Sequence, residues 1–203
     1  MTLVIVRYAD MPRQSDARDR MIRTAAVLFR EHGVQGTSFA DVVERSGAPR
    51  GSIYHHFQGG KTELAEEATR WAGQYIVAST AAALEEDDPV QAIRLLHADW
   101  AGQLRRTDFD AGCAIVAGAL EGAREPAVRA AADEAFAAWE KVLADAFRRR
   151  GIPAARARSI ATLLIAAIEG AVVLARARRS TTPLERVGKE LETVVALALA
   201  ESG

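Results

Sequence analysis

Several features that mark other protein classes are scarce in this 203-residue chain. There is a single cysteine, Cys113, so no intrachain disulfide can form, which fits a reducing cytoplasm rather than a secreted scaffold. No unbroken apolar run approaches the roughly 20 residues of a membrane span. The net charge is only −1, so the molecule as a whole does not favour a polyanionic partner. We therefore expect a cytoplasmic protein without disulfides and without a membrane partner.

The residues that are abundant favour helices. The sequence contains 42 alanines and is 49% hydrophobic, whereas it has only six prolines. That apolar content is enough for a sizeable core, in one domain of ordinary size or two small ones. The expected fold class is all-α, with about nine helices and no strand.

Helical periodicity and end signals locate the expected helices. Ser38 with Asp41 resembles a capping pair, Asp88-Pro89 is a good start signal, and Thr182 with Glu185 forms a Thr-x-x-Glu capping box. We expect residues 1–15 to form a loose arm, 16–62 a helix-turn-helix domain, and 63–203 a larger helical domain. The helices are expected at about 16–32, 38–46, 49–57, 61–86, 88–104, 113–122 and 126–150, with two more beginning at 153 and 182.

The first three expected helices have the order of a DNA-binding helix-turn-helix: long helix, short helix, tight turn, short helix. Ile53 and Phe57 would face inward from the last helix. Its outward side chains can donate to phosphates or base edges, and Gly51 leaves room for a DNA backbone. Residues 1–61 carry +3, a modest basic excess. The expected outward set is Arg50, Ser52, Tyr54, His55 and His56.

The segment "TSFADVVERSGAPRGSIYHHFQGGKTELAEEA" resembles the DNA-binding domain of TetR-family transcriptional repressors, and the resemblance covers residues 16 to about 68. The variants "PRGSIYHHF" and "GGK", with "AGCAIVAGALE" at 111–121, resemble the LmrA/YxaF-type subgroup, in which proline is common where this chain has Ala114. The resemblance implies that Lys61, Thr37 and Ser38 contact phosphates. It also implies that Arg50, Gly51 and Ser52 begin the recognition helix, and that Tyr54, His55 and His56 contact backbone or bases.

The helix expected after Pro153 has an apolar arc of roughly 200°, wider than one core requires. A second chain could pack against the part of the arc that the core does not need. Such a dimer would present two recognition helices to a palindromic DNA site. A monomer in which this helix is simply central is the alternative. The predicted interface consists of Leu164, Ile168, Val172, Leu191, Val194 and Val195.

In the larger domain expected at residues 63–203, large aromatic side chains, a few of them with a polar atom, lie on the inward faces of the helices. Each of them can be plain core, but apolar walls with sparse polar groups also form small-molecule pockets. The family resemblance implies an effector cavity there, for a small hydrophobic or amphipathic molecule. The predicted lining is Trp71, Tyr75, His97, Trp100, Phe109, Cys113, Phe136 and Trp139.

The leading hypothesis is a homodimeric repressor that binds a palindromic operator in double-stranded DNA and is released by a small effector. A non-specific DNA-binding protein is one alternative, although a larger basic excess than +3 would be expected. A helical metal-dependent enzyme is another. The side chains of the neighbouring residues His55 and His56 would point about 100° apart on a helix, so they cannot easily bind the same metal ion. Helical zinc motifs place their two histidines four residues apart. We expect no enzyme activity, no catalytic residue, no cofactor and no metal.

Overall fold

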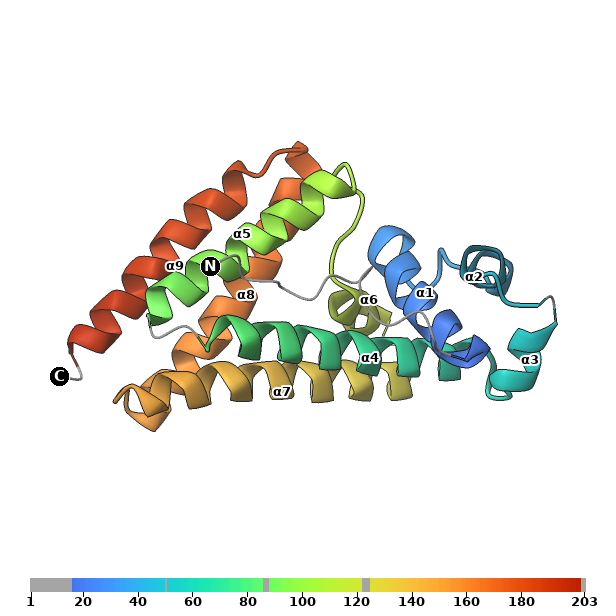
Figure 1. Ribbon diagram of the computed structural model, residues 1–203, viewed down its shortest axis with the longest axis horizontal. Helices are drawn as coiled ribbons and strands as arrows, with labels where there is room; N and C mark the ends of the chain where they lie inside the picture. The colour runs from blue at the N-terminus through green and yellow to red at the C-terminus, as the bar shows by residue number, and fades with distance from the viewer. Residues whose placement is uncertain (1–15, 50, 86–87, 122–124, 202–203) are drawn as a thin grey trace. The chain divides into compact units, whose positions relative to one another are not determined.

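The computed structural model describes residues 16–49, 51–85, 88–121 and 125–201, and within these residues the chain forms nine α-helices and no strand (Figure 1). The all-α expectation is confirmed. The predicted arm at residues 1–15 and the predicted DNA contact Arg50 lie outside the described residues. The helices are α1 (Ala17–His32), α2 (Phe39–Ser46), α3 (Ser52–His56), α4 (Gly60–Ala83), α5 (Pro89–Arg106), α6 (Ala114–Glu121), α7 (Pro126–Arg149), α8 (Ala154–Arg178) and α9 (Thr182–Ala200).

The helices group into two compact units. Among the described residues, the N-terminal unit consists of residues 16–75 together with Ala111–Phe136, and the C-terminal unit of Ile76–Asp110 together with residues 137–201. Helices α4 and α7 each contribute one part to each unit. The N-terminal unit thus contains more than the predicted helix-turn-helix segment, because α6 and parts of α4 and α7 fold with it.

A side-chain cap explains where α2 begins, and a glycine conformation explains where α3 begins. Ser38 and Asp41 form the predicted capping box, and Gly47 ends α2 in the left-handed region with φ 65°. Helix α3 begins at Ser52, later than the predicted start near Pro49. The reason is Gly51, whose φ of 87° cannot continue a right-handed helix.

Helix α6 belongs to the N-terminal unit because a reciprocal pair of hydrogen bonds fastens it to α1. The buried Arg30 donates from Nε to the carbonyl of Gly112 at 2.8 Å, and the Gly112 amide donates to the Arg30 carbonyl at 2.7 Å. Further along, the Gln35 amide donates to Glu121 at 3.0 Å. These contacts join residues about 80 positions apart, so sequence periodicity alone does not indicate them.

In the C-terminal unit, α9 packs against both α5 and α8. The His97 ring of α5 lies flat on the backbone of α9, where a Cβ at Gly188 would stand 2.6 Å from three ring atoms. Arg94 also pairs with Glu192 at 2.7 Å. The predicted Thr182–Glu185 capping box is wrong: the N-cap is Thr181, which makes no side-chain cap hydrogen bond, and its hydroxyl donates to the Glu185 carboxylate at 2.7 Å. The Thr182 amide donates to the Ser180 hydroxyl at 3.2 Å.

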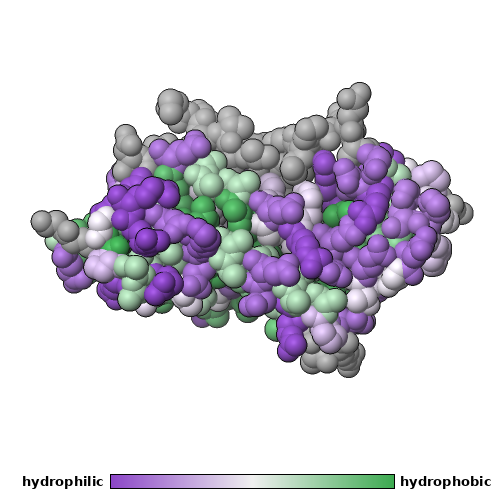
Figure 2. All heavy atoms as spheres, turned by 90° about the horizontal axis from the view of Figure 1, so that it is seen from below, coloured by the Kyte–Doolittle hydropathy of each residue, from purple (hydrophilic) through white to green (hydrophobic). Residues whose placement is uncertain are grey.

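Helix α8 is long and apolar enough to cross a membrane by length and composition, with 25 residues and a mean hydropathy of 1.9 over an 18-residue stretch. Core helices of soluble proteins pass the same test. Here the side chains of Ile160, Leu164, Ile168 and Val172 are buried inside the protein, as in a core helix. On the face drawn in Figure 2, hydrophobic areas are interrupted by hydrophilic residues.

Candidate nucleic-acid interface

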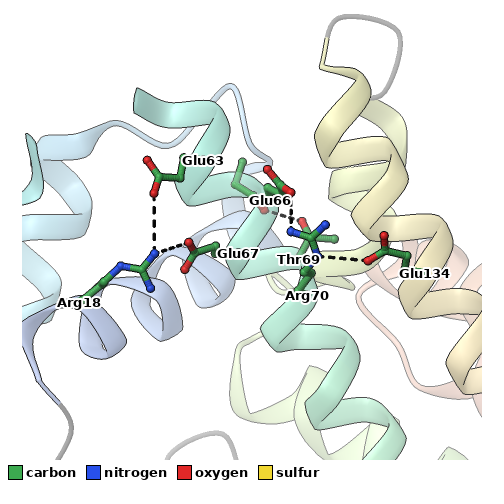
Figure 3. Close-up of polar contacts among 8 residues, drawn as sticks. Arg18, Glu63, Glu66, Glu67, Thr69, Arg70 and Glu134 are labelled. Carbon is green, nitrogen blue, oxygen red and sulfur yellow. Dashed lines mark hydrogen bonds and ion pairs between the residues drawn. The ribbon is translucent and has the colours of Figure 1, made fainter. Parts of the chain in front are cut away.

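Two buried side chains hold α3 in place. Ile53 and Phe57 are each 1% exposed, as predicted for the inward face of this helix. The Arg18 guanidinium of α1 lies over the Phe57 ring, 5.2 Å from its centroid. Arg18 also pairs with Glu67, and with Glu63 at 3.7 Å, both on α4 (Figure 3). Helices α1, α3 and α4 are therefore connected at one point, which fixes the outward face of α3.

Three of the predicted contact residues are outward on α3. Tyr54 is 68% exposed, His55 is exposed and His56 is partly exposed. The two imidazole rings meet edge to face, with centroids 5.5 Å apart. Ser52 is half-buried, and its hydroxyl donates to the Pro49 carbonyl at 2.8 Å. The exposed rings present hydroxyl and imidazole groups that can donate to phosphates and to base edges.

At the start of α2, Ser38 and Thr37 differ in accessibility. Ser38 is exposed, and its Oγ accepts from the Asp41 amide at 3.2 Å. Hydrogen bonds from the Ser38 amide and hydroxyl lower the pKa of the Asp41 carboxyl. Thr37 is only 2% exposed, and its hydroxyl donates to the Gly33 carbonyl at 2.9 Å. The Thr37 side chain is thus engaged inside the unit, which leaves Ser38 as the accessible hydroxyl.

Lys61 lies beside the linker between α1 and α2. Its Nζ donates to the Gln35 carbonyl at 3.2 Å, three residues before Ser38. The tertiary structure therefore brings the start of α4 close to the linker that leads into α2. Lys61 as a whole is half-buried, so part of the residue faces solvent.

A groove of about 550 Å³ lies between α2 and α3. One of its lining residues, Phe39, packs its ring edge to face against Tyr54, with centroids 5.4 Å apart. No role for Phe39 was predicted from the sequence. The one sequence feature that could have drawn attention to it is its position directly after the helix cap Ser38. The groove is lined by Phe39, Ala40, Val43, Glu44, Gly47, Ala48, Gly51, Ile53 and Tyr54.

The part of the chain that the structure describes has no group of three or more His, Cys, Asp or Glu side chains that could hold a metal. His55 and His56 are thus a pair without a third ligand among the described residues.

The residues predicted to line an effector cavity divide between the units. Trp71, Tyr75, Cys113 and Phe136 belong to the N-terminal unit, and His97, Trp100, Phe109 and Trp139 to the C-terminal unit.

The predicted dimer interface needs revision, because five of its six residues are buried inside the single chain. Leu164, Ile168, Val172, Leu191 and Val195 are each at most 3% exposed, and only Val194 is partly exposed. The large apolar side chains that remain exposed on α8 and α9 are Leu163, Val173, Leu174 and Leu197. The apolar arc of α8 is thus shared between a covered stripe and an open one.

Comparisons with known proteins agree with this architecture. A family model described as bacterial regulatory proteins, tetR family, matches residues 21–68, and a model of the LmrA/YxaF-like transcriptional regulator C-terminal domain matches residues 89–190. The chain is 39% identical over 190 residues to an uncharacterised HTH-type transcriptional regulator of Mycobacterium tuberculosis, covering 91% of this chain and 96% of the relative. It is 32% identical to the regulator YxaF of Bacillus subtilis, covering 91% and 98%. A TetR transcriptional regulator from Legionella pneumophila shares the fold, with a TM-score of 0.78 at 19% identity over 90% of this chain and 98% of that one.

Proposed function

Because this chain belongs to the TetR family of transcriptional regulators, with an LmrA/YxaF-like C-terminal domain, we propose that it is a repressor that binds a palindromic operator as a homodimer and is released by a small effector. The observation that carries the DNA-binding step is α3, whose inner side chains Ile53 and Phe57 are buried while Tyr54 and His55 face outward. A helix held in this way can present its outer side chains to the major groove.

In this proposal, side chains near α3 make the contacts to DNA phosphates. Ser38 and Lys61 flank the linker between α1 and α2, with an exposed hydroxyl and a cationic group. Arg50 is kept as a contact from the family resemblance alone. Contacts to phosphates fix the position of the recognition helix, and contacts to base edges supply specificity.

The open stripe on α8 supports a homodimer. At 100° per residue, Leu163, Gly170 and Leu174 lie within about 40° of one another around the helix. A Cβ at Gly170 would meet nothing within 4 Å, so a partner helix can approach closely here. Leu163 and Leu174 are each 46% exposed, and Leu197 of α9 is 58% exposed. Burial of these side chains against a second copy would remove them from water.

Unpaired polar atoms support effector binding in the C-terminal unit. Trp139 Nε1 and Thr80 Oγ1 are buried and have no hydrogen-bond partner. A buried polar group without a partner costs roughly 1–3 kcal/mol, so a ligand that offers an acceptor or donor there gains from the pairing. A small amphipathic molecule, with an apolar body and one or two polar groups, has that chemistry.

The test is selection of binding sites from a random duplex library by the full-length protein. The proposal expects an inverted repeat whose half-site centres are one helical turn, about 34–36 Å, or a multiple of that apart. Competition with random duplex at fixed salt should leave this complex largely intact. Equal affinity for random and selected duplexes would instead favour the non-specific DNA-binding protein.

Effector release is tested separately with the selected duplex. Candidate amphipathic compounds are first screened for a rise in melting temperature of the free protein, since a ligand that binds the folded state stabilises it. A compound that is an effector should then weaken the DNA complex, with a coupling of about 1–3 kcal/mol. A compound that raises the melting temperature and leaves DNA affinity unchanged is not an effector.

A further inference from the structure

The Phe39–Tyr54 pair forms an apolar surface at the junction of α2 and α3. The Phe39 ring meets the Tyr54 ring at 73°, with centroids 5.4 Å apart. Edge-to-face contacts of this kind fix the orientation of both rings. Tyr54 is 68% exposed, so its ring contributes little to the core and its free side faces solvent. An exposed aromatic ring held by a second ring is preorganised for contact with something outside the chain.

The surroundings of the pair are unsuited to a phosphate. Among the described residues that line the groove of about 550 Å³ that contains it, the charged one is the acidic Glu44, and the other side chains include Ala40, Val43 and Ala48. A carboxylate repels phosphate, and a phenyl ring offers no hydrogen-bond donor. The Phe39 ring is therefore suited to an apolar partner.

The position of Phe39 places that partner on the DNA. Phe39 is the first residue of α2 and directly follows the exposed cap Ser38, the proposed phosphate contact. The rise along a helix is only about 1.5 Å per residue, so the ring lies close to the same DNA backbone. Tyr54 reaches this place from α3, the proposed recognition helix. The apolar group on the major-groove edge of a base pair is the C5-methyl of thymine.

We propose that Phe39 and Tyr54 together contact the C5-methyl group of a thymine in each operator half-site, and that Phe39 is thereby a specificity-determining residue. This inference rests on the proposed repressor function. The Tyr54 hydroxyl remains available for a polar contact, while its ring and the Phe39 ring surround the methyl group.

The test replaces thymine by uracil, which removes only the methyl group. A duplex selected from a random library by the wild-type protein is synthesised with thymine and with uracil at each thymine in turn, symmetrically in both half-sites. At one position the wild-type protein should bind the uracil duplex about three- to fivefold more weakly per half-site, the value of one buried methyl group. Phe39→Ala should bind the two duplexes equally.

Matched variants separate loss of the methyl contact from general loss of affinity. Lys61→Met should weaken binding to the thymine and uracil duplexes by the same factor, because a phosphate contact carries no base information. The ratio of the two affinities should therefore stay at the wild-type value. Tyr54→Phe should also keep the ratio, since the ring is retained. If circular dichroism shows that Phe39→Ala does not fold, Tyr54→Ala at the exposed ring takes its place and should likewise lose the ratio.

Two results would overturn the methyl contact and leave the repressor in place: specific binding with equal affinity for thymine and uracil at every position, or a Phe39→Ala variant that folds and keeps the wild-type ratio. Equal affinities would mean that the rings contact no thymine methyl group. Failure to select any specific duplex would overturn the repressor function and this inference together.

Discussion

Phe57 and His55 lie two residues apart near the end of α3, and their opposite exposure gives them opposite roles. Phe57 is 1% exposed under the Arg18 guanidinium, whereas His55 is exposed. We predict that Phe57→Ala lowers the free energy of unfolding by about 3–5 kcal/mol, as expected for loss of a buried ring. His55→Ala should leave stability within about 0.5 kcal/mol of wild type and weaken DNA binding.

Urea denaturation and operator titration of both variants check this pair of roles. A His55→Ala protein that unfolds as easily as Phe57→Ala would show that the imidazole is part of the core. An unchanged operator affinity in His55→Ala would remove this residue from the DNA contacts.

His97 should make stability depend on pH. Burial lowers the pKa of this imidazole from its ordinary value of 6.5, against the opposing effect of Glu192, whose Oε1 lies 3.7 Å from Nε2. Below about pH 6.5 the unfolded chain therefore binds a proton that the folded chain resists, so the free energy of unfolding falls as the pH drops. Urea denaturation at pH 7.5 and 5.5 should show this loss for the wild type, and a smaller one for His97→Asn. An identical loss in both proteins would contradict the assignment.

At the scale of elements, helices α4 and α7 approach closely at one glycine. A Cβ at Gly73 of α4 would stand 2.5 Å from the Ala135 Cβ and 3.2 Å from its Cα on α7. Since a backbone atom cannot move aside alone, Gly73→Ala must separate the two helices. We predict that it lowers the free energy of unfolding by about 1–3 kcal/mol, as overpacking does. Thermal and urea denaturation measure the change.

Gly102 in α5 is the matched control. A Cβ there would meet only the guanidinium end of the exposed Arg106, at 3.1 Å, and that side chain can move. Gly102→Ala should therefore stabilise the protein by about 0.5–1 kcal/mol through helix propensity. A destabilisation equal to that of Gly73→Ala would mean that both positions respond to a general effect of alanine and not to helix contact.

At the scale of the whole molecule, the open stripe of α8 is the proposed dimer interface. We predict that Leu163→Glu combined with Leu174→Glu converts a dimer into a monomer, because two charges would replace the exposed leucines at the proposed interface. The monomer should bind one half-site and lose most of its affinity for the palindrome. Analytical ultracentrifugation and operator titration measure the two effects.

Leu120→Glu provides the control for this experiment. Leu120 of α6 is 79% exposed and lies in the N-terminal unit, away from the α8 stripe in the sequence. A variant at this position should remain a dimer with wild-type operator affinity. Dissociation of the Leu120 variant, or a dimeric Leu163/Leu174 variant, would place the interface elsewhere.

Local sequence signals were enough to predict the all-α fold, the order of the nine helices in the described residues, the capping box of Ser38 and the inward placement of Ile53 and Phe57. Caps, glycines and helical periodicity act within a turn or two of the residues that carry them, so they can be recognised locally. The family could be recognised from the same segment.

Only the tertiary structure decided which part of the wide apolar arc of α8 is covered, because periodicity shows that an arc is apolar but not which side a neighbouring helix occupies. The tertiary structure also shows that Thr37 is buried, that Arg30 is hydrogen-bonded to Gly112, 82 positions away, and that the rings of Phe39 and Tyr54 from two helices are in contact. These features depend on residues that are distant in the chain and meet only after folding, so no local pattern predicts them.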